Sequence, residues 1–231
     1  MLPIDGRRDG HSTRRHPGGK IDRVPTDEDD VRTALIRQWE LIAGAVPYID
    51  VARPSRIDGW SNGEVLAHLY VQPHLVSRFL RTASDKEPEL GVADNLAGTK
   101  ALRDVIDTSA QEGALLNKFD ISGPLMATRS SVLSAPLAQT IETVQGSISI
   151  EDYLVTRCVE AVVHGGDLIE PVAPDPVAEA IAATALLHVL AVSAPNFVAE
   201  ARALPRGEWI NCATGRDIAA GPLSGATPVM S

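Results

Sequence analysis

Aromatic residues and cysteines are scarce in this chain of 231 residues. Aromatic side chains make up 4% of the sequence, so the core must be built from Ala, Val, Leu and Ile, which favours packed helices over an aromatic-rich β-sandwich. Cys158 and Cys212 are too few for a disulfide framework and fit a reducing cytoplasm, which we predict as the location. The sequence has no continuous run of about 18 apolar residues and no apolar leader, so we expect neither a membrane span nor a secretory signal.

Basic residues are outnumbered by acidic residues, 21 against 30, and the formal net charge is −9. The charge is unevenly spread, because residues 1–26 hold six basic and three acidic side chains and the rest therefore carries −12. A body this acidic repels phosphate backbones, so we expect no nucleic-acid partner. The apolar share of 44% is that of an ordinary globular protein.

Composition divides the chain into three parts. Residues 1–25 are rich in Gly, Arg, His and Pro and are expected to form a disordered tail. Residues 26–203 have helical periodicity and are expected to form one bundle. Residues 204–231 are rich in Gly, Pro, Ser and Thr and are too few for an independent domain.

Apolar spacing and capping signals predict where the helices begin and end. The first helix is expected to run from Thr26 to Val46, with acidic residues in its first turn. The second should open with a capping box formed by Ser61 and Glu64 and should kink at Pro73. Further helices are expected over residues 99–120, 125–145, 149–170 and 176–203, with a loop over 84–98, a break at Gly123 and Pro124, and a short strand and turn over 207–215.

The segment 149–170 carries an ionisable stripe on an otherwise apolar helix. At about 100° per residue, six polar side chains fall within about 100° of arc, namely Tyr153, Thr156, Arg157, Glu160, His164 and Asp167. A helix that is apolar around the rest of its circumference should be buried on most sides. The stripe then faces water, or forms a closed salt-bridge network around Arg157, or presents Glu160 and His164 as a metal-binding pair at i, i+4 spacing.

A metal site needs a third protein ligand, and His68 is the candidate because it lies on the apolar face of the second helix. The alternative is a core histidine that binds no metal. His74 and Cys158 lie on other sides of their helices, and His188 lies in an apolar helix, so we expect none of them to join the ion. Two histidines and one glutamate leave a position open, as in catalytic zinc sites, and Asp167 is placed to orient a ligand from behind.

Two segments resemble the signature helices of a known family. GWSNGEVLAHL (Gly59–Leu69) and SIEDYLVTRCVEAVVHGGDL (Ser149–Leu168) are similar to those of the mycothiol-dependent maleylpyruvate isomerase family, part of the DinB-like superfamily, and the similarity extends over roughly residues 27–203. It implies an all-α, DinB-like up-down four-helix bundle, here with an extra C-terminal helix and a short irregular tail. It also implies that a divalent metal, usually zinc, is bound by a set of three ligands that corresponds here to His68, Glu160 and His164, with Arg157 and Asp167 behind them.

The resemblance further implies mycothiol as a cofactor whose sulfur takes the open metal position as a thiolate. In the isomerases, thiolate addition to a cis double bond permits rotation before elimination, and other relatives resemble thiol transferases. We therefore expect an isomerase or thiol transferase that acts on a small-molecule electrophile.

A non-catalytic metal- or ligand-binding module is the alternative, and a purely structural helical protein is a third reading. The isomerases carry a second, C-terminal domain that supplies substrate contacts, including a cationic one. Here only 28 residues follow the last expected helix, and the basic residues among them, Arg206 and Arg216, have no clear match in that domain.

Overall fold

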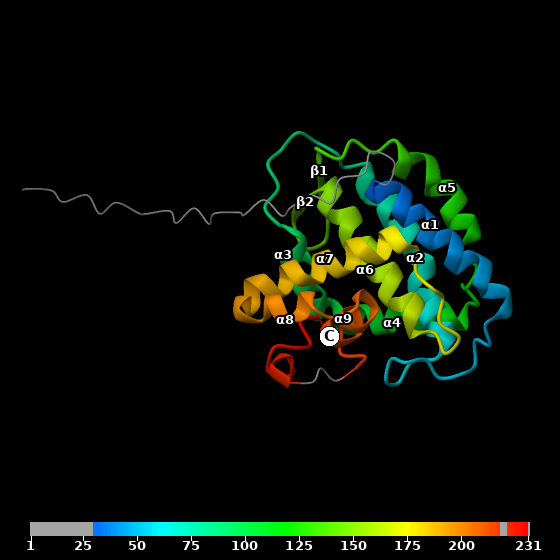
Figure 1. The fold of residues 1–231 in the computed structure, drawn as a ribbon. Helices are drawn as coiled ribbons and strands as arrows, with labels where there is room; N and C mark the ends of the chain where they lie inside the picture. Colours follow the sequence, from blue (N-terminus) through cyan, green and yellow to red (C-terminus); the bar gives the residue numbers. More distant parts are fainter. Residues whose placement is uncertain (1–29, 218–220, 231) are drawn as a thin grey trace, which may run out of the picture.

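The structure, a computed structural model, describes residues 30–217 and 221–230 and is almost entirely helical within them (Figure 1). The expected tail of residues 1–25 lies outside the described residues. A two-stranded antiparallel sheet, β1 (Thr140–Glu142) with β2 (Ser147–Ser149), is the only sheet in the described part of the chain. The predicted all-α fold is confirmed.

Four helices form the central bundle: α1 (Val31–Ala45), α2 (Asn62–Leu80), α5 (Ser122–Leu133) and α6 (Ile150–Asp167). The helices α1 and α2 each pack against both α5 and α6, which closes the ring. The apolar faces meet in a core whose largest side chain, Trp39, has no solvent exposure. This core holds α2 and α6, the two helices of the expected metal site, side by side.

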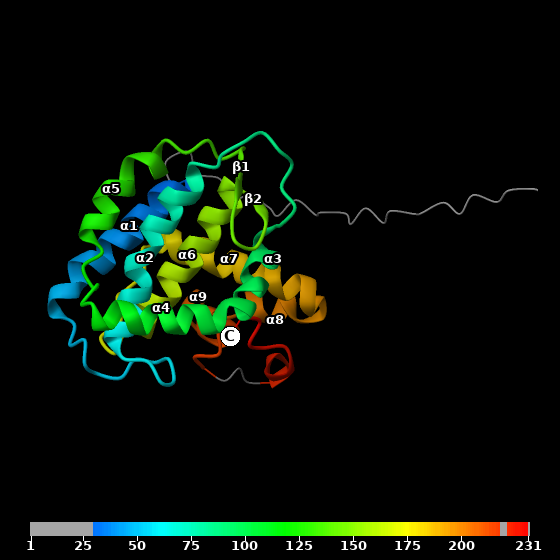
Figure 2. The ribbon, with the colours of Figure 1, turned by 180° about the vertical axis from the view of Figure 1, so that it is seen from behind.

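Further helices cover the bundle on two sides. On one side α4 (Arg103–Leu115) packs against α2, as Figure 2 shows from behind. On the other side α7 (Pro176–Ser193) packs against α6 and is joined by α3 (Val92–Gly98) and α9 (Arg206–Ala213) in a second apolar cluster. A short helix, α8 (Val198–Arg202), lies between α7 and α9 in the chain.

The starts of α2 and α6 are fixed by their caps. The hydroxyl oxygen of Ser61 accepts a hydrogen bond from the Glu64 N–H at 3.2 Å, and the Glu64 carboxylate accepts one from the Ser61 N–H at 2.6 Å. This is the predicted capping box, and the helix continues through Pro73. The hydroxyl of Ser149 accepts in the same way from the Asp152 N–H at 3.0 Å. Both helices that carry the candidate ligands therefore begin at defined residues.

The contact between α2 and α4 is close because a glycine faces it. A β-carbon added to Gly113 would lie 2.9 Å from the β-carbon of Ala67, which is nearer than two such atoms approach in proteins. Only glycine therefore allows α4 to lie at this distance from α2. Ala67 directly precedes His68, so this contact borders the expected site.

Several predicted boundaries are wrong. Helix α1 begins at Val31, because the Asp30 side chain is its N-cap and accepts from the Arg32 N–H. The expected loop over 84–98 contains α3, whose start is held by the Asp94 carboxylate. Pro124 lies in the first turn of α5, where a helix needs no N–H donor, so it does not break the chain there. The sheet replaces the end of the helix expected over 125–145.

The C-terminal region also departs from the prediction. The helix expected over 176–203 ends at Ser193, ahead of Pro195. The segment expected as a strand and turn is the helix α9, because its buried residues Trp209, Ile210, Cys212 and Ala213 recur at helical spacing. The Trp209 side chain is 1% exposed and donates a hydrogen bond to the Ala183 carbonyl at 3.0 Å. The helix α9 thus packs onto α7.

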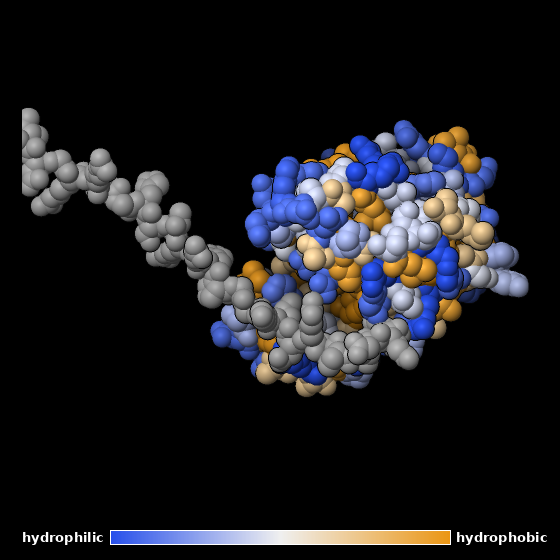
Figure 3. Space-filling view, turned by 90° about the horizontal axis from the view of Figure 1, so that it is seen from above, coloured by the Kyte–Doolittle hydropathy of each residue, from blue (hydrophilic) through white to orange (hydrophobic). Residues whose placement is uncertain are grey.

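Helix α7 differs from what composition indicated about membrane spans. Its 18 residues have a mean hydropathy of 1.6, which is apolar enough for a helix that crosses a membrane. A core helix of a globular protein meets the same criterion, and 39% of this stretch is buried, with α6 and α9 packed against it. Figure 3 shows the molecule from above. Hydrophilic side chains cover much of the face seen in this view, with hydrophobic patches between them.

Candidate metal centre

His68, Glu160 and His164 meet between α2 and α6. The Glu160 Oε2 atom lies 3.1 Å from Nε2 of His68 and 3.4 Å from Nε2 of His164. If each residue offers one ligand atom, the three atoms all lie within 4.8 Å of one another. His68 and Glu160 are buried, and the His164 side chain keeps 15% exposure, so the centre is closed except on the His164 side.

A chain of hydrogen bonds fixes how His68 presents itself. The Arg157 Nη1 group donates to Oε1 of Gln72 at 2.7 Å, which turns the Gln72 amide nitrogen towards Nε2 of His68 at 3.1 Å. An amide N–H can only donate, so Nε2 must offer its lone pair. The same nitrogen faces the Glu160 carboxylate, which also offers only lone pairs. Two acceptors this close need a cation or a proton nearby.

His164 is held from behind by a carboxylate. Its Nδ1 atom lies 2.8 Å from Oδ2 of Asp167, a residue with no solvent exposure. Asp167 in turn accepts from Arg216, from Nε at 2.8 Å and from Nη2 at 2.7 Å. Because the carboxylate accepts only, Nδ1 carries a hydrogen and Nε2 is directed towards Glu160. Metal-binding histidines are typically oriented by such a carboxylate.

Burial and neighbouring charges shift the pKa values of the three candidate ligands. Burial alone would raise the pKa of Glu160, but the adjacent imidazoles of His164 and His68 and the charge of Arg157 bring it well below its usual range. Burial lowers the pKa of His68. Burial would also lower the pKa of His164, but its bonds to Asp167 and Glu160 outweigh this and raise it to about 9. Glu160 is therefore ionised and His68 neutral, as metal ligands must be.

Asp167 is shifted in the opposite direction to a carboxyl that is merely buried. Burial would raise its pKa, but the bonds from Arg216 and His164 lower it to about 2. It stays ionised at any ordinary pH, so its hold on Nδ1 of His164 is permanent.

The donor set fits a divalent ion. Ligand atoms of a tetrahedral zinc ion, each about 2.0–2.1 Å from the metal, are separated from one another by about 3.3 Å. The two separations from Glu160 Oε2, 3.1 and 3.4 Å, are close to that value, and all three donor atoms lie within 4.8 Å of one another. Two imidazoles and one carboxylate are the ligand types that zinc and similar ions take, and three protein ligands leave a position for a thiol.

Three interpretations of the polar stripe on α6 were open from the sequence. The structure excludes one of them and corrects another. Its members are buried or nearly so, which excludes a stripe that faces water. The salt-bridge network around Arg157 is wrong in its members, because Arg157 donates to Gln72 and Thr156, whereas Arg216 pairs with Asp167. The stripe residues form ion pairs with His68, with Arg216 and with one another, and the donor atoms of His68, Glu160 and His164 are also close enough together for a metal site.

The other residues considered from the sequence lie elsewhere. His74 is exposed and stacks edge-on with Tyr70, and His188 is on α7. Cys158 is fully buried, and burial raises its pKa, so it is no metal ligand in this fold. Gln72 and Arg216 were not foreseen. The contact of Gln72 could be inferred from the sequence, because Gln72 lies one helical turn from His68 on the same face. The contact of Arg216 could not, because its partner Asp167 is 49 residues away.

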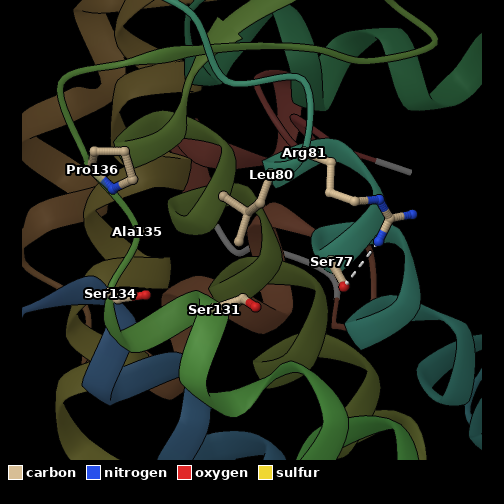
Figure 4. Close-up of a pocket in the computed structure, with 7 residues that line it drawn as sticks. All are labelled: Ser77, Leu80, Arg81, Ser131, Ser134, Ala135 and Pro136. Atoms are coloured by element: carbon tan, nitrogen blue, oxygen red, sulfur yellow. Dashed lines mark hydrogen bonds between the residues drawn. The ribbon is translucent and has the colours of Figure 1, made fainter.

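A hollow on the surface lies apart from this centre. Figure 4 shows it between the last turn of α2 and the end of α5, where Arg81 donates to the Ser77 hydroxyl at 3.4 Å. Its lining is Ser77, Leu80, Arg81, Ser131, Ser134, Ala135 and Pro136. These residues offer no imidazole, thiol or carboxylate, so the hollow is no competing metal site.

Comparison with known proteins agrees with the geometry. The family model described as the mycothiol maleylpyruvate isomerase N-terminal domain matches residues 32–169, which is more than half of the chain and includes all of α2 and α6. No curated protein and no solved structure matches the chain. The chain therefore belongs to the family of the mycothiol maleylpyruvate isomerase N-terminal domain.

Proposed function

We propose that the chain binds one divalent ion, zinc in the first instance, through His68, Glu160 and His164, and that mycothiol supplies the thiol for the open position. The observation that carries this proposal is the convergence of three ligand atoms from two helices within 4.8 Å. Membership of a mycothiol-related family supports the choice of thiol.

The residues of the chain have distinct roles in this proposal. A bound divalent ion lowers the pKa of a thiol, so that a thiolate is available near neutral pH. Asp167 holds Nδ1 of His164 and so directs its Nε2 towards the centre before any ligand arrives. The Gln72 amide contacts the same Nε2 of His68 that would bind the ion, so it has to give up this contact when the ion binds. Glu160, kept ionised, supplies one negative charge to the centre.

The proposed reaction is addition of the thiolate to a small-molecule electrophile, followed either by elimination, as in cis–trans isomerisation, or by retention of the adduct, as in thiol transfer. Neither outcome requires another cofactor. We place the protein in the cytoplasm, with no nucleic-acid or membrane partner, on the basis of its two cysteines and its acidic charge.

Metal analysis of the purified protein tests the first step. We expect about one equivalent of divalent metal per chain, lost in His68→Ala and in His164→Ala because two ligands cannot hold the ion. His74→Ala is the matched control, since this exposed histidine is on the same helix and should leave the metal content unchanged. Wild-type protein that takes up no added zinc would end the proposal.

A non-catalytic binding module is the second candidate, because the family match covers only an N-terminal domain and ends at residue 169. A measurement of turnover separates this module from an enzyme. Mixing mycothiol with an electrophile should consume free thiol faster with wild type than with His68→Ala. If zinc-loaded wild type consumes thiol no faster than His68→Ala, the binding module is favoured.

A further inference from the structure

We propose that Arg216, which lies outside the region matched by the family, is a positioning residue of the metal centre and couples the C-terminal segment to metal binding. The inference rests on the proposed metal site. It assigns a role to residues 205–217, which follow the bundle and include α9, labelled in the lower part of the molecule in Figure 1.

The segment that carries Arg216 is anchored independently of the site. Helix α9 packs against α7, with Trp209 buried and bonded to Ala183. The chain then reverses at Gly215, whose φ of 74° suits glycine, and the Arg216 N–H donates to the Asn211 carbonyl at 2.8 Å. The guanidinium is thus delivered to the end of α6 by a folded element.

The contact it makes there is a two-point ion pair. Arg216 donates to both carboxylate oxygens of Asp167 at 2.8 and 2.7 Å. Asp167 is the last residue of α6 and is fully buried, and the negative end of a helix disfavours a carboxylate. Arg216 therefore compensates a charge that would otherwise be costly, and a planar guanidinium does so with fixed geometry.

A third segment closes the same corner. The Arg56 N–H donates to the Asp167 carbonyl at 2.8 Å, and its guanidinium lies 3.6 Å from the Asp217 carboxylate. The loop before α2, the end of α6 and the C-terminal segment thus meet at one residue. That residue is the one that holds His164.

The expected consequence is a coupling between docking and metal affinity. Without Arg216, the Asp167 carboxylate loses its fixed position, and the His164 ring loses its orientation. Loss of an outer partner of a metal ligand typically lowers metal affinity by about 10–100-fold, and we expect about tenfold for Arg216→Gln. Because coupling is reciprocal, zinc should also stabilise the docked state of residues 206–217.

The test measures zinc affinity by competition with a chelator on the full chain. Wild type, Arg216→Gln, Arg216→Lys and Arg206→Gln are compared, the last being an exposed arginine in the same segment. We expect about tenfold weaker binding in Arg216→Gln, a partial recovery in Arg216→Lys, which keeps the charge without the fork, and no change in Arg206→Gln. Hydrogen exchange of residues 206–217 in wild type should slow when zinc is added.

The outcomes separate this inference from the proposed function. No zinc binding by wild type refutes the metal site itself. Zinc binding by wild type with an affinity matched within twofold by Arg216→Gln overturns only the role of Arg216. If Arg216→Gln does not fold, hydrogen exchange decides, and exchange in residues 206–217 that is unchanged by zinc overturns the coupling.

Discussion

Metal binding at this centre should release one proton per ion at mildly acidic pH. The metal-free His164 has a pKa raised to about 9, so it carries a proton at pH 6–7, whereas His68 is neutral and Glu160 ionised. An ion must displace the proton from His164 before it can bind there. At pH 7 this displacement costs about two pH units, or about 2.7 kcal/mol. Apparent zinc affinity should therefore rise about tenfold per pH unit below the pKa of His164.

Calorimetric titration with zinc measures this release directly. At pH 6.0 a zinc-bound water, whose pKa is near 7 in catalytic sites, keeps its protons and does not add to the count. Titrations in two buffers of different ionisation enthalpy should give about one proton per zinc, and chelator competition should show about tenfold tighter binding at pH 7.0 than at pH 6.0. Arg206→Gln should give the same count.

Two other counts would refute the reasoning in different ways. Release of no proton would mean that His164 is neutral and that Asp167 does not raise its pKa. Release of two would mean that His68 is also charged, which contradicts the orientation of Gln72 by Arg157.

Three further predictions concern the rest of the chain. Trp39→Ala should lower the free energy of unfolding by about 3–5 kcal/mol, because the side chain is fully buried, while Tyr48→Ala, at 85% exposure, should change it by less than about 0.5 kcal/mol; urea denaturation measures both. Cys158 should resist a thiol-specific reagent until urea unfolds the protein, because burial raises its pKa and blocks access, and rapid labelling of the native protein would show that the core opens. Deletion of residues 1–25 should leave the melting temperature nearly unchanged, since they contain little apolar surface to bury, and a large fall would show that this segment packs on the fold.

The candidate ligands could be predicted from the sequence because each depends on local spacing. Glu160 and His164 are one turn apart on a helix whose other faces are apolar, and His68 follows a capping box that sets the phase of its helix. Periodicity thus placed each side chain on a face. The need of a metal site for a third ligand, together with the family resemblance, predicts that the two faces meet, and the structure brings the three donor atoms within 4.8 Å of one another.

What the sequence did not reveal depends on contacts between distant segments. The predicted partner of the stripe was Arg157, which is local, yet Arg216 pairs with Asp167 from 49 residues away. No periodicity carries that information. Likewise, Gly123 and Pro124 resemble a break, but they lie in the first turn of α5. That helix begins at Ser122, whose N–H donates to the Asp120 carboxylate, and periodicity does not reveal this start.

The close approach of Gly113 to Ala67 means that a substitution at position 113 can change the position of His68 without contacting it. Any larger residue there must push α4 outward or shift Ala67, and with it the turn of α2 that bears the first histidine. A Gly113→Ala library member would thus alter the spacing between two helices while every ligand kept its identity. A change of metal affinity at this centre can therefore be sought at the crossing of α2 and α4 as well as among the ligands themselves.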